Sequence, residues 1–296
     1  MAFLYFSQQE VDFAVIEVGM GGRLDATNII IPEVSIITNV DFDHMDHLGE
    51  TKHAIAREKA AIIKESRPLI TAETDPTILT YLKEVCNEKH SQFYLVNELQ
   101  IIPKDESLTS QSFHVHGAFN GEFSISMLGQ HQQINAATAL LAIQALRDRN
   151  IALSNAAIKE GLTKAVWPGR LQFLSTRPLI LLDGAHNVAG MKTAVEFLKR
   201  FPKKKVLILG IAHDKEIAAM VKLIAPLFGE VIVTKGNYKP TPTEILAAEV
   251  EKYAKVTIVN SPRDALDLAR QKAQDDELIF ITGSLYLIGD ILSIFR

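Results

Sequence analysis

In the second half of the chain, short apolar runs alternate with segments in which apolar residues recur at helical spacing. The first such unit is "PLILLDGAHN" followed by "AGMKTAVEFLKRF", and the alternation repeats about five times before the chain ends. This pattern predicts βαβ crossovers and a buried parallel sheet with helices on both faces. Because ligands of such sheets bind beyond the carboxyl ends of the strands, the polar residues that follow each apolar run are the candidates for chemistry.

The first half of the chain is less regular. It predicts the following elements: buried strands over 12–18 and 34–40, a helix over 50–64, a strand at "RPLITA", a helix over 76–90, short strands between 92 and 127 with a hairpin turn at Asn120-Gly121, and helices at "HQQINAATALLAIQAL" and 154–164. The segment "VWPGR" at 166–170 contains Pro and Gly, and the composition changes after it. We therefore predict two α/β domains, residues 1–170 and 171–296.

Composition narrows the class of protein. The 296 residues carry a net charge of −4, which argues against a general nucleic-acid surface. A single cysteine excludes an intrachain disulfide, and no run of about 18 apolar residues is present to cross a membrane. The first residues lack the positive charge of a signal peptide. We expect a soluble, cytoplasmic protein that acts on small molecules, without nucleic-acid or membrane partners, and as a monomer.

The stretch "DFAVIEVGMGGRLDATN" places three glycines after a lone glutamate, Glu17. The glycines fit neither the dinucleotide fingerprint, which needs a third Gly three residues beyond the second, nor the P-loop, which needs Gly-Lys-Ser/Thr. What remains is a carboxylate at the end of an expected strand, followed by a backbone that can turn sharply. Such a carboxylate could hold Mg²⁺. A capping or ion-paired Glu before a glycine turn is the alternative.

A second stretch, "TNVDFDHMDHLG", follows the next expected strand and packs five acidic or imidazole side chains into seven residues: Asp41, Asp43, His44, Asp46 and His47. This density suits a cation site or a general base. A transition-metal site is a second possibility, although no cysteine lies here to support it. An acidic loop that caps a helix is the third.

Further candidates stand alone in the sequence. Lys59 lies in the helix expected over 50–64, among Ala56, Ala60 and Ile63, where shielding from water would lower its pKa; a surface lysine is the alternative. Asp183 and His186 follow the first strand of the second half, where a helix amino end attracts phosphate, although both residue types also serve as ordinary caps. Arg170 at the expected domain boundary could bridge a nucleotide through its guanidinium, or remain solvated.

Together these stretches resemble the folylpolyglutamate synthase/dihydrofolate synthase family of the Mur ligase superfamily. The motifs that carry the resemblance occur in family order: "EVGMGGRLDATN", "TNVDFDHMDHLG", "REKAAIIK", "GQHQQINAATAL", "VWPGRLQ", "LLDGAHN" and "TGSLYLIGD". They span the chain from about residue 11 to 290. The resemblance implies a central domain of the P-loop Mur ligase type over 1–170, incomplete at its N-terminal side, and a Rossmann-like ligase domain over 171–296.

The resemblance also implies an activity and a set of residue roles. ATP would phosphorylate a carboxylate of a folate or dihydropteroate, and the glutamate amine would attack the acyl phosphate to form an amide. Fixed cations and donors would meet the charge that develops during phosphoryl transfer. The implied roles are Mg²⁺ binding for Glu17 and His44, carbamylation for Lys59, pterin contact for Asp25, adenine contact for Asn135, nucleotide contact for Arg170 and Asp183, and phosphate contact for His186.

One departure from the family pattern is large. The family carries a Gly-Lys-Ser phosphate loop on an earlier strand and helix, and this sequence contains none. The sequence thus resembles the family without its first quarter to third, and we expect these 296 residues alone to have little or no ligase activity.

Three other functions remain open at this point. A peptidoglycan-precursor amino-acid ligase would share the domain plan, although "GMGGRLDATN" favours the folate branch. A nucleotide-binding oxidoreductase would suit the alternating second half, but neither half has G-x-G-x-x-G after a strand. A non-catalytic fragment that binds a partner is the third.

Overall fold

The computed structural model describes residues 1–42 and 45–295. The chain divides into two compact units, and each is treated by itself below. The first comprises 1–102, 114–122 and 134–158, and the second comprises 103–113, 123–133 and 159–296.

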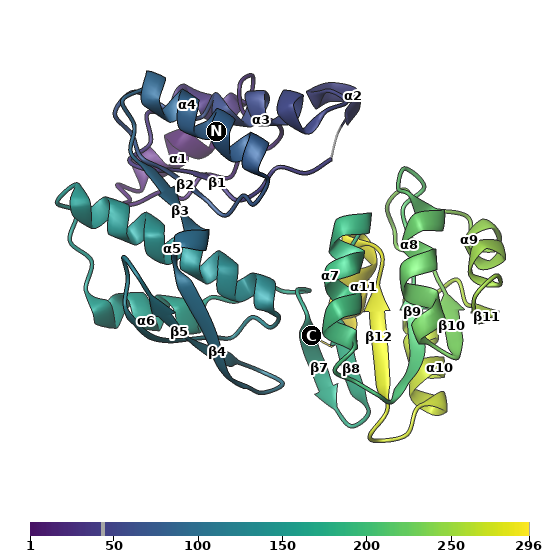
Figure 1. Cartoon of the computed structure of the whole chain (residues 1–296). Coiled ribbons are helices and arrows are strands. Elements are labelled where there is room, and N and C mark those ends of the chain that lie inside the picture. The colour runs from purple at the N-terminus through teal and green to yellow at the C-terminus, as the bar shows by residue number, and fades with distance from the viewer. Residues whose placement is uncertain (43–44, 296) are drawn as a thin grey trace. The chain divides into compact units, whose positions relative to one another are not determined.

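The second unit is built on a six-stranded sheet of order β11-β10-β9-β12-β8-β7 (Figure 1). Its strands are β7 (Gln172–Thr176), β8 (Leu179–Leu182), β9 (Lys204–Leu209), β10 (Glu230–Val233), β11 (Lys255–Ile258) and β12 (Leu278–Thr282). All neighbours pair in parallel except β7 and β8, which are antiparallel. The parallel sheet predicted from the alternating pattern is confirmed, and β7 is an edge strand that the pattern did not predict.

Helices cover both faces of this sheet, as the apolar runs require. One core joins the sheet to α7 (Val188–Leu198), α8 (Ile217–Ile224) and α9 (Thr243–Val250), and the other joins it to α10 (Pro262–Lys272) and α11 (Leu285–Ile294). Neighbouring residues of one strand enter opposite cores: Leu181 faces the first and Leu182 the second. The helices after the adjacent strands β8 and β12 therefore lie on opposite faces, which opens a ligand-binding crevice at their carboxyl ends in folds of this kind.

The first unit holds a smaller parallel sheet, β1-β2-β3, made of β1 (Ser35–Ile37), β2 (Leu69–Thr71) and β3 (Phe93–Leu95) (Figure 1). Between these strands the chain forms α2 (Met45–Leu48), α3 (Lys52–Ala60) and α4 (Pro76–Glu88). Ile55, Leu69 and Leu82 come from α3, β2 and α4 and meet in one core. The helices expected over 50–64 and 76–90 are thus confirmed, with shorter bounds.

The strand expected over 12–18 does not form, and this prediction was wrong. Residues 14–18 have no regular secondary structure, and Val15 is 99% exposed. An apolar run becomes a strand only where a neighbouring backbone supplies ladder hydrogen bonds. In the described sheet β1 pairs only with β2, and residues 12–18 join no sheet.

The remaining elements complete the two units. A three-stranded sheet has the order β4-β5-β6, with β4 (Gln100–Glu106), β5 (Gln111–His116) and β6 (Gly121–Ile125). The turn before Gly121 is closed by hydrogen bonds between Asn120 and Gly117. The other helices are α1 (Ala2–Gln8), α5 (Gln130–Asp148), α6 (Asn155–Lys164) and the short 3₁₀ segments η1 (Ala26–Ile29), η2 (Val96–Glu98) and η3 (Ala225–Leu227). In the part of the chain that the structure describes, no helix combines the length and apolar character needed to cross a membrane.

Candidate functional site

The glycine-rich turn of the first unit packs against the end of α3. A Cβ atom on Gly22 would lie 2.6 Å from the carbonyl oxygen of Glu58, and Gly21 has a φ of 67°. The Arg23 N–H donates to that same carbonyl at 2.9 Å, and the Arg23 Nε donates to the Glu58 carboxylate at 2.9 Å. Glycine is therefore required at position 22 by close backbone approach, and the turn lies directly beside Lys59, whose Cα is 3.2 Å from the same Cβ position.

Asp25 fixes the far side of this turn. Its Oδ1 accepts hydrogen bonds from the N–H and hydroxyl of Thr27, and its Oδ2 accepts one from the Met20 N–H at 3.0 Å. The Thr27 hydroxyl, then the two N–H groups, lower the pKa of Asp25 from 3.8 to about 2. Asp25 is thus an ionised cap of η1 that holds the loop, whatever else it contacts.

The resemblance implies three residues near Mg²⁺: Glu17, His44 and Lys59. Glu17 is exposed in the irregular segment rather than at a strand end, and Lys59 is half-buried in the last turn of α3. His44 lies outside the described residues, as does its neighbour Asp43. Within 1–42 and 45–295, no three His, Cys, Asp or Glu side chains form a group that could hold a metal ion.

Carboxylates are nevertheless among the residue types that bind Mg²⁺, although the described residues do not gather them into one group. This ion takes oxygen ligands, keeps several waters and is commonly held by one or two carboxylates together with substrate phosphates. Glu17 and Asp41 both expose carboxylates to solvent, and Asp41 follows β1 at the carboxyl end of the strand. The ion would add positive charge beside a transferring phosphoryl group.

In the second unit, Asp183 directly follows β8 at the carboxyl end of the strand, which pairs with β12. Its Oδ2 accepts the Leu171 N–H at 3.0 Å and its Oδ1 accepts the Ala185 N–H at 2.9 Å. Burial raises the pKa of Asp183, whereas these two N–H groups, the guanidinium of Arg170 and His186 act in the opposite direction. Asp183 is only 8% exposed, so its carboxylate is largely shielded from water. The charged or ionisable groups close to it are Arg170 and His186.

The segment that contains Arg170 is docked on this unit. The Gly184 N–H donates to the Gly169 carbonyl at 2.7 Å, and Leu171 is buried in the core around α7. Gly169 has a φ of 76°, and a Cβ there would meet Ile288 at 2.6 Å. Arg170 is therefore held between two anchored neighbours, which restricts where its guanidinium can lie.

His186 precedes the amino end of α7. Its Nδ1 lies 2.9 Å from the Gly184 carbonyl oxygen, so Nδ1 carries the proton and Nε2 is left as the second functional atom of the ring. Asn187 caps the helix by accepting the Gly190 N–H at 2.8 Å. The free N–H groups of a helix amino end favour anions, which agrees with the expected phosphate contact.

Two buried glutamines and a half-buried histidine were not predicted as site residues. His131 lies near Arg170, and burial, followed by the charge of Arg170, lowers its pKa. Gln133 donates to Gln111 at 2.8 Å, and Gln111 donates to the carbonyl oxygens of Met127 and Gly129. His131 and Gln133 belong to "GQHQQ" at the start of α5, but Gln is mostly an exposed residue type, so the sequence carries no signal for this burial.

Asn135 and Trp167 are exposed. Asn135 belongs to the first unit, so its geometry is described apart from that of Arg170 and Asp183. Trp167, the only tryptophan, is 60% exposed beside the anchored Gly169–Leu171 segment.

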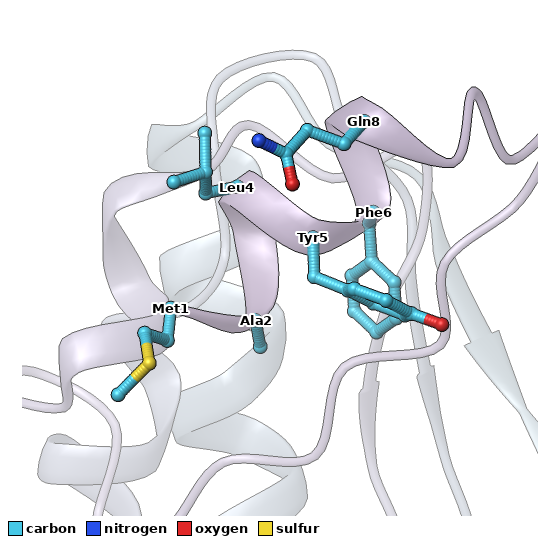
Figure 2. A pocket seen from close by; sticks show the side chains of 6 residues that line it. All are labelled: Met1, Ala2, Leu4, Tyr5, Phe6 and Gln8. Atoms are coloured by element: carbon cyan, nitrogen blue, oxygen red, sulfur yellow. The ribbon is translucent and has the colours of Figure 1, made fainter.

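The surface around α1 contains a hollow of about 420 Å³ lined by Met1 and by residues of that helix (Figure 2). The lining residues are Met1, Ala2, Leu4, Tyr5, Phe6 and Gln8. None of these side chains is charged or nucleophilic at neutral pH, so they offer no catalytic group.

Comparison with known proteins defines the class first. The Mur ligase middle domain matches residues 1–143, and the Mur ligase glutamate ligase domain matches residues 169–285. A dihydrofolate synthase/folylpolyglutamate synthase of Bacillus subtilis is 34% identical over 98% of this chain and 69% of its own length. The chain belongs to the folylpolyglutamate synthase/dihydrofolate synthase family of ATP-dependent ligases.

Solved structures agree with this assignment. The folylpolyglutamate synthase of Thermotoga maritima matches 99% of this chain and 68% of its own with a TM-score of 0.86 at 33% identity. An Escherichia coli FolC structure, in complex with DHPP and ADP, matches 99% of this chain and 68% of its own with a TM-score of 0.83 at 28% identity. The architecture is thus the central and C-terminal α/β arrangement of these ligases, as the resemblance implied.

Proposed function

We propose that the protein joins L-glutamate to the carboxylate of a folate or dihydropteroate, with ATP supplying an acyl phosphate. The observation that supports this most directly is the buried Asp183 carboxylate near Arg170 and His186, at the carboxyl end of β8 in the C-terminal sheet. Membership of a family of ATP-dependent ligases supports it independently. ATP use also agrees with the ADP present in the related FolC structure.

The residue roles in this proposal follow the chemistry of each group. Arg170 and Asp183 contact the nucleotide, the first through charge and the second through its remaining lone pairs. His186 meets the phosphates through Nε2, since Nδ1 is engaged. Asn135 contacts adenine. The lowered pKa of His131 favours its neutral imidazole, which adds no charge that would repel Arg170.

The proposal for the first unit concerns the folate and the cation. Asp25 contacts the pterin, and Lys59 acts as a carbamate. Glu17 and His44 hold Mg²⁺, which would stabilise charge on the phosphates. Residues 1–170 and 171–296 act as the two domains, and the protein works as a cytoplasmic monomer.

The test is glutamate-dependent release of ADP by the purified chain, with dihydropteroate and then tetrahydrofolate as acceptor. We expect release to be weak because no Gly-Lys-Ser loop is present in these 296 residues. Asp183→Asn should abolish whatever release is measured, whereas Asp276→Asn, on an exposed ion pair with Lys203, serves as the matched control. Turnover with a UDP-linked muramyl acid and none with either pterin acceptor would contradict the folate assignment.

A further inference from the structure

The connection from β10 to α9 contains a segment that reaches away from its own strand. Residues 235–240, called the strap below, follow β10 and contact α11, the helix that follows β12. The approach is close, because a Cβ atom on Gly236 would lie 2.8 Å from the backbone nitrogen of Leu287. Since β9 lies between β10 and β12 in the sheet, the strap crosses the carboxyl end of β9 to make this contact. The proposed ligation gives the strap no role.

Polar and aromatic contacts hold the strap on α11. The main-chain N–H and the side-chain amide of Asn237 donate to the two carboxylate oxygens of Asp290 at 3.2 and 2.7 Å. The rings of Tyr238 and Tyr286 stack with their centroids 4.3 Å apart, although each residue is about half exposed. The strap therefore holds the first two turns of α11, where Tyr286 and Asp290 lie.

The other side of the strap is bonded to the chain that continues from β9. The His213 N–H donates to the Lys239 carbonyl at 2.9 Å, and the Thr241 N–H donates to the Ile211 carbonyl at 3.0 Å. The strap is thus fixed at its carboxyl side by main-chain hydrogen bonds, independently of α11. Loss of one side chain at the other side should release the contact with α11 without unfolding the rest of the connection.

The amino end of α11 packs on the loop that carries Asp183. A Cβ atom on Gly184 would lie 2.5 Å from Cδ2 of Leu285, the first residue of the helix. The Gly283 N–H donates to the Ala185 carbonyl at 3.1 Å, and the Ala185 N–H donates to Asp183 Oδ1 at 2.9 Å. One residue, Ala185, therefore connects the turn before α11 to the buried carboxylate.

We propose that Tyr238 is a positioning residue: its ring fixes Tyr286 in the first turn of α11, and the turn before that helix holds the Asp183 loop. The positioning rests on these contacts alone, whereas its consequence for a bound nucleotide rests on the proposed function of Asp183. The alternative is that the stacked pair only stabilises the second unit as a whole. The experiment must separate these two roles.

Three variants test the role of the ring. Tyr238→Ala removes it, Tyr238→Phe keeps it and loses only the hydroxyl, and Tyr253→Ala removes another exposed tyrosine of the same unit, between α9 and β11. In Tyr238→Ala, hydrogen exchange measured by NMR should accelerate at Gly283 and Ala185 by roughly three- to tenfold, the factor that one aromatic pair contributes. Tyr238→Phe and Tyr253→Ala should exchange at wild-type rates.

Amides in β12 provide the internal reference. Ile279 and Phe280 are fully buried, one in each core of the sheet, so their exchange requires opening of the unit rather than of the strap. If Tyr238 only stabilised the unit, its loss would accelerate all four amides by the same factor. If it is a positioning residue, its loss accelerates Gly283 and Ala185 relative to Ile279 and Phe280.

The second readout is ADP, used alone as the probe of the site. In the wild type, ADP should shift the amide signals of Ala185 and His186, and the concentration for half of the shift should rise several-fold in Tyr238→Ala. Tyr253→Ala should leave this midpoint unchanged. Signal shifts also report weak binding, which suits a sequence without a Gly-Lys-Ser loop.

The outcomes are distinguishable. Equal acceleration of all four amides in Tyr238→Ala, or unchanged exchange at Gly283 and Ala185, would overturn the positioning role. Selective acceleration without any ADP effect in the wild type would support the positioning role and contradict the nucleotide contact of the proposed function. Selective acceleration with an unchanged ADP midpoint would overturn the link from Tyr238 to nucleotide binding.

Discussion

Three carboxylates of this chain, Asp25, Glu73 and Asp183, accept hydrogen bonds from main-chain N–H groups of neighbouring turns. Each of them holds a loop at the end of a strand or the start of a helix, so the loops depend on single side chains. Such hydrogen bonds to a charged acceptor are stronger than those between neutral groups. Loss of one carboxylate should therefore loosen one loop without unfolding its unit.

The Asp25 loop should be sensitive to acid. Because the pKa of Asp25 is lowered to about 2 from 3.8, its contribution to stability is complete above 3.8 and is lost as the pH falls from 3.8 toward 2. A carboxyl ¹³C NMR titration should give a midpoint of about 2. Thr27→Val removes the largest cause and should move the midpoint upward. A wild-type midpoint near 3.8 would show that the loop hydrogen bonds are absent in solution.

His131 should titrate below its ordinary range. A lowered pKa means that the folded protein favours the neutral ring, so this contribution to stability is present above the ordinary value of 6.5 and is lost as the pH falls below it. Arg170→Met should raise the midpoint in an imidazole NMR titration, though not fully to 6.5, since burial is the larger cause. Arg177→Met, at an exposed position in the second unit, should leave the midpoint unchanged.

At the scale of elements, the contact between the glycine-rich turn and α3 has no room for a side chain. Gly22→Ala should lower the free energy of unfolding by about 1–3 kcal/mol, because its Cβ meets a backbone oxygen that cannot rotate away. Chemical denaturation followed by circular dichroism would measure the change.

A second glycine provides the control. Gly161 lies in α6 with nothing within 4 Å of its Cβ position, so Gly161→Ala should raise the free energy of unfolding by about 0.5–1 kcal/mol. Equal effects of the two substitutions would contradict the close approach at Gly22.

The elements that the sequence predicted best are those with their own local signals. The strands and helices of the second unit alternate between continuous apolar runs and helical periodicity, with caps such as Asn187 and Ser261 at the helix starts. The segment 12–18 has the same apolar run, but a strand needs a partner backbone that the run itself does not encode. Strand β7 was missed because an edge strand is half-exposed and lacks the apolar run.

The candidate site residues divide in the same way, into those with a local sequence signal and those without one. Asp183 was identifiable because a polar residue directly after a buried strand lies at a known edge of the sheet. Tyr238 also lies in the connection after a strand, but its partner Tyr286 follows a different strand, and no pattern of residue types reveals the contact. His131 escaped because its environment is formed by residues distant in the sequence, Arg170 among them.

At the scale of the molecule, Cys86 can report on the opening of the first unit. It is 1% exposed in the core with α3 and α4, and burial raises the pKa of its thiol to about 11. Alkylation by iodoacetamide at pH 8 should be slower than that of a free thiol by about a thousandfold or more, because the reactive thiolate needs the core to open. Alkylation at the rate of a small-molecule thiol would show that this core is open in solution, and Cys86→Ser provides the unreactive control.

The exposure of Trp167 determines what tryptophan fluorescence can report in this protein. Because the sole indole is 60% exposed, its emission in the native protein should already resemble that of indole in water. Denaturation would then shift the emission maximum very little, and a flat trace during a melt would not mean a stable protein. A blue shift on adding a nucleotide or a pterin would instead show that the ligand had covered the indole.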